Sequence, residues 1–325
     1  MYSEKFLLVL ASVLICNALA LESLDNEWKL WQSNYGKKYS TPREEEYRRK
    51  IWESNWHMVT EHNQQANQGN ATYRMKMNHF ADKSEKELAK ASCFRLPTPE
   101  ERNLQSYREV NYGELPPSVD WREENCVTGV KNQGSFCGSC WAFATVGTIE
   151  SRYCIKSGKL IEFSEQQLVD CDHSNFGCCG GFPLSAFEYA VQYGLMKSSN
   201  YKYKGHGTEC RYKERLVMSL NSSKFYDLSG EENMASALAI DGPMSVAFAV
   251  AFPFYFYSEG IFDGWCAGGL NHAMLAVGYG VENHEQYWIV KNSWGDSWGD
   301  DGYVKIRRNV NQCMIGMMAS AADLM

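Results

Sequence analysis

The most reactive group that the sequence offers is the thiol of Cys140, in the stretch QGSFCGSCW from Gln133 to Trp141. The apolar residues that follow Cys140 predict a helix that begins at this cysteine. A helix N-terminus stabilises a thiolate through its dipole and its backbone N–H groups. Cys140 would then be one half of a nucleophilic site, whose other half is a base that pairs with the thiolate once protonated.

Two other interpretations of Cys140 stand beside this one. In an oxidising compartment the cysteine would be half of a disulfide. Together with Cys137 it forms a C-x-x-C pair, which is typical of thiol-redox proteins, although the βαβ context of such proteins does not precede it.

The candidate base is one of the four histidines that follow residue 120, namely His173, His206, His272 and His284. His272 opens the apolar run HAMLAVGYG, which predicts a strand that would hold the imidazole rigidly. Asn292, in the stretch KNSWG, can accept the imidazole N–H and fix its tautomer, as the third member of a catalytic triad does. Taken alone, His272 would be a structural or exposed histidine and Asn292 a turn residue.

The segments around these residues predict helices first and strands second. Helices are expected after Cys140, from Ser164, where Gln167 completes a capping-box pattern, and over residues 183–193, which Gly194 ends. Short apolar or alternating runs predict strands at 244–250, 272–279, 287–291 and 303–307. This order indicates an α+β layout with a helical half and a sheet half.

The first 20 residues have the features of a secretory signal peptide. Lys5 supplies positive charge, residues 6–16 are apolar, and Ala18-Leu19-Ala20 offers a cleavage site. The alternative, a membrane anchor, would need about 20 apolar residues. We therefore expect a protein of the secretory pathway, in which most of the 12 cysteines form disulfides.

Charge and composition narrow the class of protein further. The formal net charge is −7 at pH 7, whereas a nucleic-acid-binding protein would carry a basic stripe. No cofactor and no nucleic-acid partner are expected. His173, Cys178 and Cys179 are the alternative set for a structural metal, but we expect none because disulfides would use most of these thiols.

The region from residue 21 to about 110 is charged, helical and poor in cysteine. A long helix is expected from Pro42 towards Asn63, since proline is favourable in a first helical turn. Four prolines then indicate an exposed linker, where proteolytic cleavage concentrates: Pro97, Pro99, Pro116 and Pro117.

Together these motifs resemble the papain family of cysteine proteases, and within it the cathepsin L-like branch. The family has the CGSCW signature with a histidine and an asparagine about 130–150 residues downstream. The region before the linker resembles the family's precursor helix, with matching positions at Glu44, Arg48, Trp52, Asn55, Val59 and Asn63. A following family pattern, G-x-N-x-F-x-D, is present as Lys76, Asn78, Phe80 and Asp82, so its glycine is missing.

The resemblance implies a papain-like α+β fold. It has a helical half and an antiparallel, β-barrel-like half with the active site in the cleft between them. It also implies roles for individual residues: Cys140 as nucleophile, His272 as acid and base, and Asn292 as the group that orients the imidazole. Gln133 resembles the side-chain donor of the oxyanion hole, which it would form with the backbone N–H of Cys140. This sequence has one residue more than the family between that glutamine and the nucleophile, because Phe136 is inserted, and the insertion could displace the oxyanion hole.

By the same resemblance, a substrate pocket and three disulfides are expected. The pocket for the second residue before the scissile bond would be apolar and would favour hydrophobic side chains. Its expected residues, with those that flank the cleft, are Gly180, Gly181, Phe182, Pro183, Ala247, Leu270, Ala273, Trp294 and Met318. Trp294 would also shield Asn292. The implied disulfides are Cys137–Cys178, Cys171–Cys210 and Cys266–Cys313, while a Cys126–Cys154 bridge stays open and Cys179 would be a thiol at the rim of the cleft.

We expect residues 1–20 to be a signal peptide, 21–111 an inhibitory prosegment that lies across the cleft, and 112–325 the peptidase domain. Acid would loosen the prosegment by protonating paired carboxylates, and cleavage would follow between Asn111 and Leu115. Asn70 and Asn221 begin glycosylation sequons.

The expected function is that of a cysteine endopeptidase made as a zymogen, monomeric and either lysosomal or secreted. Its expected partners are protein and peptide substrates, its own prosegment and cystatin-type inhibitors. The alternatives are a catalytically impaired homologue that binds peptides or inhibitors, and a secreted thiol-redox protein with Cys137 bridged to Cys140.

Overall fold

The structure, a computed structural model, describes residues 24–89, 94–96, 108–110, 113–220 and 222–324. The described residues form two compact units. The N-terminal unit consists of residues up to 61 together with 77–84, and the larger unit of 62–76 and everything from residue 85 onward. The expected signal peptide and the sequon at Asn221 lie outside the described residues.

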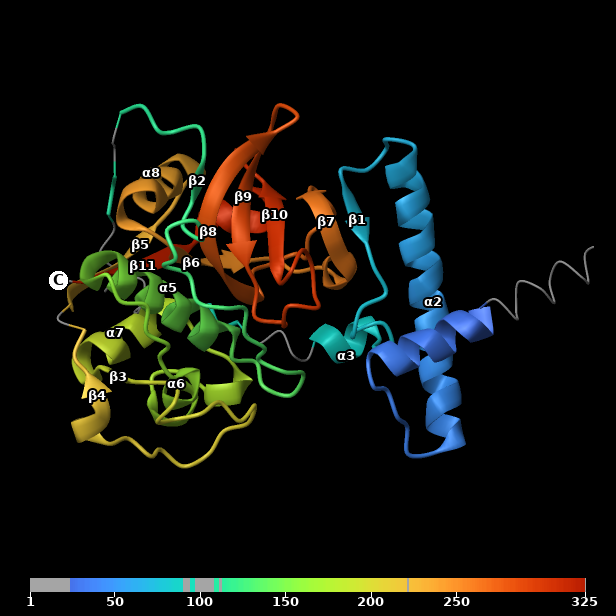
Figure 1. The fold of residues 1–325 in the computed structure, drawn as a ribbon, viewed down its shortest axis with the longest axis horizontal. Helices are drawn as coiled ribbons and strands as arrows, with labels where there is room; N and C mark the ends of the chain where they lie inside the picture. Colours follow the sequence, from blue (N-terminus) through green and yellow to red (C-terminus); the bar gives the residue numbers. More distant parts are fainter. Residues whose placement is uncertain (1–23, 90–93, 97–107, 111–112, 221, 325) are drawn as a thin grey trace, which may run out of the picture. The chain divides into compact units, whose positions relative to one another are not determined.

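The N-terminal unit has an aromatic core under helix α2, which runs Pro42–Asn67 and begins at the expected proline (Figure 1). Residues 24–34 form a further helix. Its Trp28 stacks on Trp31 at a ring distance of 5.3 Å and meets Trp52 of α2 edge-on at 5.4 Å. Aromatic side chains bury large apolar areas, so these three buried rings form much of the core of this unit.

The spaced polar residues of α2 are explained by their hydrogen bonds to the segment 77–84. Asn55 is buried, and its Nδ2 donates to the carbonyl oxygens of Ala81 at 2.9 Å and Lys83 at 3.1 Å. Arg48 donates to the carbonyl oxygen of Asp82 at 3.1 Å. These side chains occupy backbone groups that no regular ladder satisfies, so the unit depends on their spacing along the helix.

Three helices make up the helical half of the larger unit: α5 (Cys140–Ser157), α6 (Glu165–Cys171) and α7 (Pro183–Tyr193). All three were expected, and they share an apolar core that includes Trp141, Ile149 and Phe187. The shorter elements of the larger unit are α3 (Glu85–Ala89), β3 (Leu195–Met196), β4 (Val217–Met218) and 3-10 turns at Gly177–Cys179, Glu214–Leu216, Phe252–Phe256 and Gln312–Met317.

Helix α6 begins as expected, but only half of the predicted capping box forms. The Ser164 hydroxyl accepts from the backbone N–H of Gln167 at 3.0 Å. The Gln167 side chain does not return to Ser164. It donates instead to the carbonyl oxygen of Gly194 at 3.0 Å and accepts from the backbone N–H of Met196 at 2.7 Å. The backbone N–H of Ser164 already donates to the carbonyl oxygen of Met196. The Gln167 side chain therefore bonds the residues that follow α7 instead.

The sheet half is a nine-stranded sheet within the described residues, with strand order β1-β7-β10-β9-β8-β6-β11-β5 and with β2 paired to β8 (Figure 1). Every pair is antiparallel except β7 with β10, which run parallel. The strands are β1 (Tyr73–Met75), β2 (Val119–Asp120), β5 (Ser222–Leu228), β6 (Met244–Phe248), β7 (Tyr257–Phe262), β8 (His272–Glu282), β9 (Glu285–Lys291), β10 (Tyr303–Arg307) and β11 (Ala319–Leu324).

The four strands expected from the sequence exist, with small shifts at their ends. Residues 303–307 match β10, and β8 continues three residues beyond the expected end. Strands β5, β7 and β11 and helix α8 (Glu231–Asp241) were not expected. No helix among the described residues is long and apolar enough to cross a bilayer.

Within the described residues, four disulfides join segments of the larger unit. They are Cys137–Cys178, Cys171–Cys210 and Cys266–Cys313, the three pairs that the resemblance implies, and also Cys126–Cys154, which the sequence leaves open. Cys140 is a buried thiol outside these bridges, so it is not paired with Cys137 as a redox protein would require. Cys179 is an exposed thiol.

Replacing Asn55 with alanine is expected to destabilise the N-terminal unit by about 1–3 kcal/mol, because two backbone carbonyls lose a buried donor. The measurement is hydrogen exchange of residues 77–84 in the full-length Cys140→Ala protein, which cannot process itself. Ser54→Ala, at the exposed neighbouring position of α2, is the matched control. Equal protection in the two variants would contradict this account of the helix.

Candidate active site

Cys140 is the first residue of the 18-residue helix α5 and is completely buried. The thiol therefore lies where the helix dipole favours a negative charge. Cys140 forms a small buried cluster with Ala144, one turn further along α5, and Ala273, the second residue of β8. The N-terminal ends of α5 and β8 are thus in contact with each other.

His272 is the first residue of β8, and its Nε2 lies 2.9 Å from Asn292 Oδ1. The backbone N–H of Ser293 donates to the same oxygen at 2.8 Å, which fixes the orientation of the amide. An amide oxygen can only accept, so Nε2 carries the proton. Nδ1 is then the imidazole nitrogen available to a thiol. The ring of Trp294 lies 4.8 Å from the imidazole.

The pKa of His272 is lowered to about 4, because burial disfavours the imidazolium; the hydrogen bond to Asn292 opposes this effect. The imidazole is therefore neutral over most of the pH range in this form of the chain. A neutral imidazole can accept a proton from a thiol, whereas burial opposes the imidazolium that this transfer would form.

Gln133 keeps a fixed position in spite of the inserted residue. Its Oε1 accepts from the Ser293 hydroxyl at 2.7 Å, and its Nε2 donates to the carbonyl oxygen of Cys137 at 3.2 Å. Phe136 is 96% exposed, so its side chain lies in solvent, while Gln133 is buried. Sequence reasoning did not find the residues that hold this loop. Besides Ser293 they include Tyr203, whose hydroxyl donates to the carbonyl oxygen of Gln133 at 2.8 Å and lies 2.7 Å from Ser139 Oγ.

The apolar residues expected to form the substrate pocket lie around a segment of the chain's own N-terminal region. Phe94 packs against the cluster of Cys140 and Ala273, and its ring meets that of Phe182 edge-on at 6.1 Å. The backbone of Phe94 forms a bridge with Gly181, and Arg95 N–H donates to the carbonyl oxygen of Gly181 at 3.1 Å. A side chain on Gly181 would collide with Trp141, since its Cβ would lie 2.5 Å from the indole.

The remaining expected pocket residues are placed as follows. Gly180, Pro183 and Ala247 are buried, as is Trp294, while Leu270 and Met318 are partly exposed. Ala247 N–H donates to the carbonyl oxygen of Met318 at 2.9 Å, and Ala247 pairs with Ala273 across β6 and β8. These contacts bring Ala247, Ala273 and Met318 together, with Phe94 of the same chain packed on Ala273.

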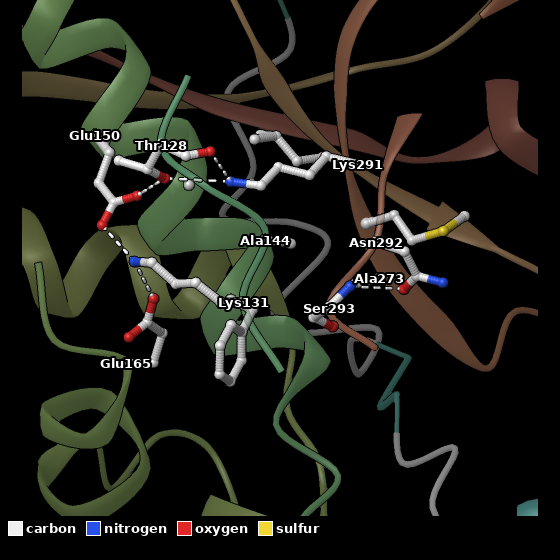
Figure 2. A pocket seen from close by; sticks show the side chains of 13 residues that line it. Thr128, Lys131, Ala144, Glu150, Glu165, Ala273, Lys291, Asn292 and Ser293 are labelled. Atoms are coloured by element: carbon white, nitrogen blue, oxygen red, sulfur yellow. Dashed lines mark hydrogen bonds and ion pairs between the residues drawn. The ribbon is translucent and has the colours of Figure 1, made fainter. Parts of the chain in front are cut away.

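A buried network of charged side chains, Lys131, Glu150, Glu165 and Lys291, lies next to Asn292. The sequence analysis did not find it. Figure 2 shows Lys131 between Glu150 of α5 and Glu165 of α6, at 2.7 and 2.6 Å. Lys291, the last residue of β9, donates to the carbonyl oxygen of Thr128 at 2.6 Å, and the Thr128 hydroxyl donates to Glu150 at 2.6 Å. The network thus connects helix α5, which begins at Cys140, to the strand that ends just before Asn292.

The protonation of this network follows from burial and pairing. Burial opposes the charge on Lys131, but Glu165 and Glu150 outweigh it and raise the pKa of the ammonium group. Burial lowers the pKa of Lys291 to about 8. The groups surround a cavity of about 20 Å³ that also reaches Ala273, Asn292 and Ser293. Among the described residues, no group of three or more acidic, histidine or cysteine side chains could hold a metal ion.

The contribution of His272 to the stability of this form is expected to fall as the pH is lowered from 7 towards 4. The folded pKa of His272, about 4, lies below the ordinary value of 6.5, so the unfolded chain binds the proton more readily. The histidine's contribution is complete above pH 6.5, and as much as about 3 kcal/mol is lost near pH 4. Urea unfolding of Cys140→Ala and of Cys140→Ala/His272→Gln at both pH values measures it. Identical pH slopes for the two proteins would contradict this assignment.

Comparisons with known proteins identify the family of this chain. Residues 115–323 match the sequence model of the papain family cysteine proteases, and residues 28–88 match that of the cathepsin propeptide inhibitor domain. Bovine cathepsin S is 40% identical over 314 residues, which cover 93% of each chain. Mouse procathepsin L is 40% identical over 333 residues, covering 97% of this chain and 98% of that protein.

Among solved structures, digestive procathepsin L 3 from the larval midgut of Tenebrio molitor superimposes with a TM-score of 0.85. It is 39% identical, and the match covers 93% of this chain and 99% of that one. The inhibitor domain precedes the peptidase domain in the same chain, as it does in a zymogen. This chain therefore belongs to the papain family of cysteine proteases and is a cathepsin-like cysteine endopeptidase in its proenzyme form.

Proposed function

We propose that Cys140, His272 and Asn292 are the catalytic triad of this endopeptidase and that Gln133 supplies the side-chain donor of its oxyanion hole. The observation that carries the proposal is the 2.9 Å contact between His272 Nε2 and Asn292 Oδ1. It leaves Nδ1 for Cys140, and the thiol at the start of α5 is buried in one cluster with the next residue of β8. The three groups thereby have the relations that a nucleophile, its base and an orienting group require.

The proposed reaction begins with proton transfer from the Cys140 thiol to Nδ1 of His272. The thiolate attacks the peptide carbonyl, and the Gln133 amide with the backbone N–H of Cys140 stabilises the oxyanion. The imidazolium then protonates the leaving amine, which departs and leaves a thioester on Cys140. His272 next takes a proton from water, which hydrolyses the thioester and returns the thiol. Asn292 stays hydrogen-bonded to Nε2 throughout, so the ring does not rotate.

The prosegment keeps the enzyme inactive, as its match to the inhibitor domain indicates. We assign residues 21–111 to it, residues 1–20 to a signal peptide and 112–325 to the peptidase domain. Cleavage between Asn111 and Leu115 is favoured because Gly113 and Glu114 are exposed. Phe94 and Arg95 occupy the backbone and apolar surface that a substrate would use, so their removal would open the site.

The proposed pocket for the second residue before the scissile bond prefers hydrophobic side chains. Its proposed walls are Phe182, Pro183, Ala247, Ala273, Leu270 and Met318, none of which carries a charge. The packing of Phe94 against Ala273 and Phe182 supports this preference, because an aromatic ring already fills that space.

We place the protein in the secretory pathway, with lysosomal or extracellular delivery. Four disulfides favour an oxidising compartment. Asn70 of the first sequon is exposed in the larger unit, where an oligosaccharide would meet no packed surface. Proteins and peptides are the proposed substrates, and cystatin-type inhibitors, which would use the opened cleft, are the other proposed partners.

Acid-treated wild-type protein is expected to hydrolyse dipeptide fluorogenic substrates with Phe or Leu at the second position, and to hydrolyse those with Arg there more slowly. Cys140→Ala, given the same treatment and then processed by added wild-type enzyme, should show no turnover of its own once that enzyme is removed. A thiol-alkylating epoxide should block the wild type. Folded, processed wild type without turnover would contradict the catalytic assignment and favour a peptide-binding homologue.

Gln133→Ala is expected to lower kcat by about 100- to 1,000-fold, the usual cost of one oxyanion donor. Phe136→Ala is the matched comparison in the same loop, and it should change kcat less than about twofold because the ring is solvated. Steady-state kinetics on the processed enzymes measure both. A large effect of Phe136→Ala with little effect of Gln133→Ala would contradict the proposed oxyanion hole.

A further inference from the structure

Residues 108–110, just before the proposed cleavage site, bind to the sheet half of the larger unit at β5, α8 and β11. Arg108 and Val110 face this surface, and the intervening Glu109 is exposed, as the alternation of an extended chain requires. Val110 is buried. The three residues border a pocket of about 520 Å³, whose other residues include Gly230, Asn233 and Ser236.

The Arg108 guanidinium is held by two carboxylates and an aromatic ring. It donates to Asp323 Oδ1 at 2.9 Å and to the Tyr226 hydroxyl at 3.1 Å, and it lies 3.3 Å from Asp241 Oδ2. Its carbon centre also lies 4.9 Å from the centre of the Tyr226 ring. Asp241 Oδ2 is buried and accepts no hydrogen bond within the described part of the chain, so Arg108 balances its charge.

The backbone around Arg108 is held as specifically as its side chain. Asn233 Oδ1 accepts from the backbone N–H of Val110 at 2.8 Å, while Asn233 Nδ2 donates to the carbonyl oxygen of Arg108 at 2.9 Å. The backbone N–H of Arg108 donates to the carbonyl oxygen of Asp227 at 3.2 Å. The side chain of one asparagine on α8 therefore hydrogen-bonds two backbone groups of an extended peptide, as the backbone of a neighbouring strand would.

The receiving surface is held in shape by groups of the peptidase domain itself. Arg152 of α5 is buried and donates to the Tyr226 hydroxyl at 2.7 Å and to the carbonyl oxygens of Pro243 at 3.0 Å and Ala322 at 3.2 Å. Ser320 donates to the Asp227 carboxylate at 2.7 Å. Since none of these contacts involves Arg108, the surface has its own support and would keep its shape when residues 108–110 leave.

We propose that the mature peptidase domain carries, outside its catalytic cleft, a binding site for an extended peptide with arginine followed two positions later by an aliphatic residue. The site consists of Tyr226, Asp227, Asn233, Asp241 and Asp323. This inference rests on the proposed maturation between Asn111 and Leu115, which removes Arg108–Val110 from the chain. The occupant is then the same segment of the released prosegment, because that is the peptide that this surface is seen to fit.

Such a site gives the released prosegment a second contact with the enzyme, separate from Phe94. Two weak contacts on one peptide raise its overall affinity, since the second contact forms within a complex that already exists. Glu109 is exposed, so the site does not select the residue at this position. Its specificity lies in the guanidinium, which can reach two carboxylates at once, and in the aliphatic side chain beside Asn233.

The test uses processed enzyme whose Cys140 has been alkylated by an epoxide, so that the cleft is blocked. A fluorescent peptide with the sequence of residues 106–112, SYREVNY, is titrated and followed by anisotropy. The proposal expects saturable binding that weakens about tenfold or more when alanine replaces Arg108 in the peptide. The enzyme variants Asn233→Ala and Asp323→Asn should weaken binding similarly, and their turnover of a dipeptide substrate before alkylation should equal that of the wild type.

Equal binding of the two peptides, or binding that neither enzyme variant reduces, would overturn the proposal. Intact mass of the processed chain provides the remaining control. A mature chain that still contains Arg108 would also overturn it, because the site would never be vacated. Failure of the proposed catalytic assignment appears separately, as absent turnover of the dipeptide substrate by processed enzyme before alkylation.

Discussion

The close packing of helix α5 against strand β8 is the constraint on which the active site depends. Cys140 begins the helix and His272 begins the strand, so the distance between thiol and imidazole is set by how nearly these two elements approach. Gly147 of α5 permits the approach, since a Cβ there would lie 2.9 Å from a side-chain carbon of Leu275 in β8. Two rigid elements in direct contact place reactive groups more reproducibly than loops do.

A network of buried charged side chains also connects α5 to the sheet. Lys131, Glu150 and Glu165 pair in the interior, and Lys291 binds Thr128 beside them. Buried ion pairs add little net stability, because each charge loses its hydration, but losing one partner leaves the other charge uncompensated. The network therefore restricts the alternative positions of these elements more than it raises the free energy of unfolding. It keeps Asn292 at one position relative to α5, as the orienting amide of a triad requires.

In the proenzyme, the surface proposed to bind substrate is occupied by a segment of the same chain. The residues proposed to receive a substrate receive Phe94 and Arg95 first, through the backbone of Gly181 and the apolar side chains around Ala273. In the same state burial lowers the pKa of His272 to about 4, so the imidazolium that the proposed reaction forms is disfavoured. Occlusion and electrostatics thus act in the same direction. Arg108 and Val110 add a second contact, with residues of β5, α8 and β11.

The sequence by itself determined the family, the helices around Cys140 and the residues proposed to react, because these follow from local pattern and from motif spacing. Helix α5, the cap at Ser164 and strand β10 depend mainly on neighbours within a few positions. Strands β5 and β11 were not predicted, since their partners are distant in the sequence: β11 pairs with both β5 and β6. Helix α8 was likewise missed, because its apolar residues do not gather on one clear face.

Only the tertiary structure decided the questions that depend on distant partners. The position of Gln133 is fixed by hydrogen bonds to Ser293 and Tyr203, which lie far away in the sequence, while Phe136 is exposed. The Cys126–Cys154 bridge, the buried charges and the docking of Arg108 also join segments that no local pattern connects. A sequence motif names the groups that can react. Their distances, their burial and hence their pKa values arise only when the chain is packed.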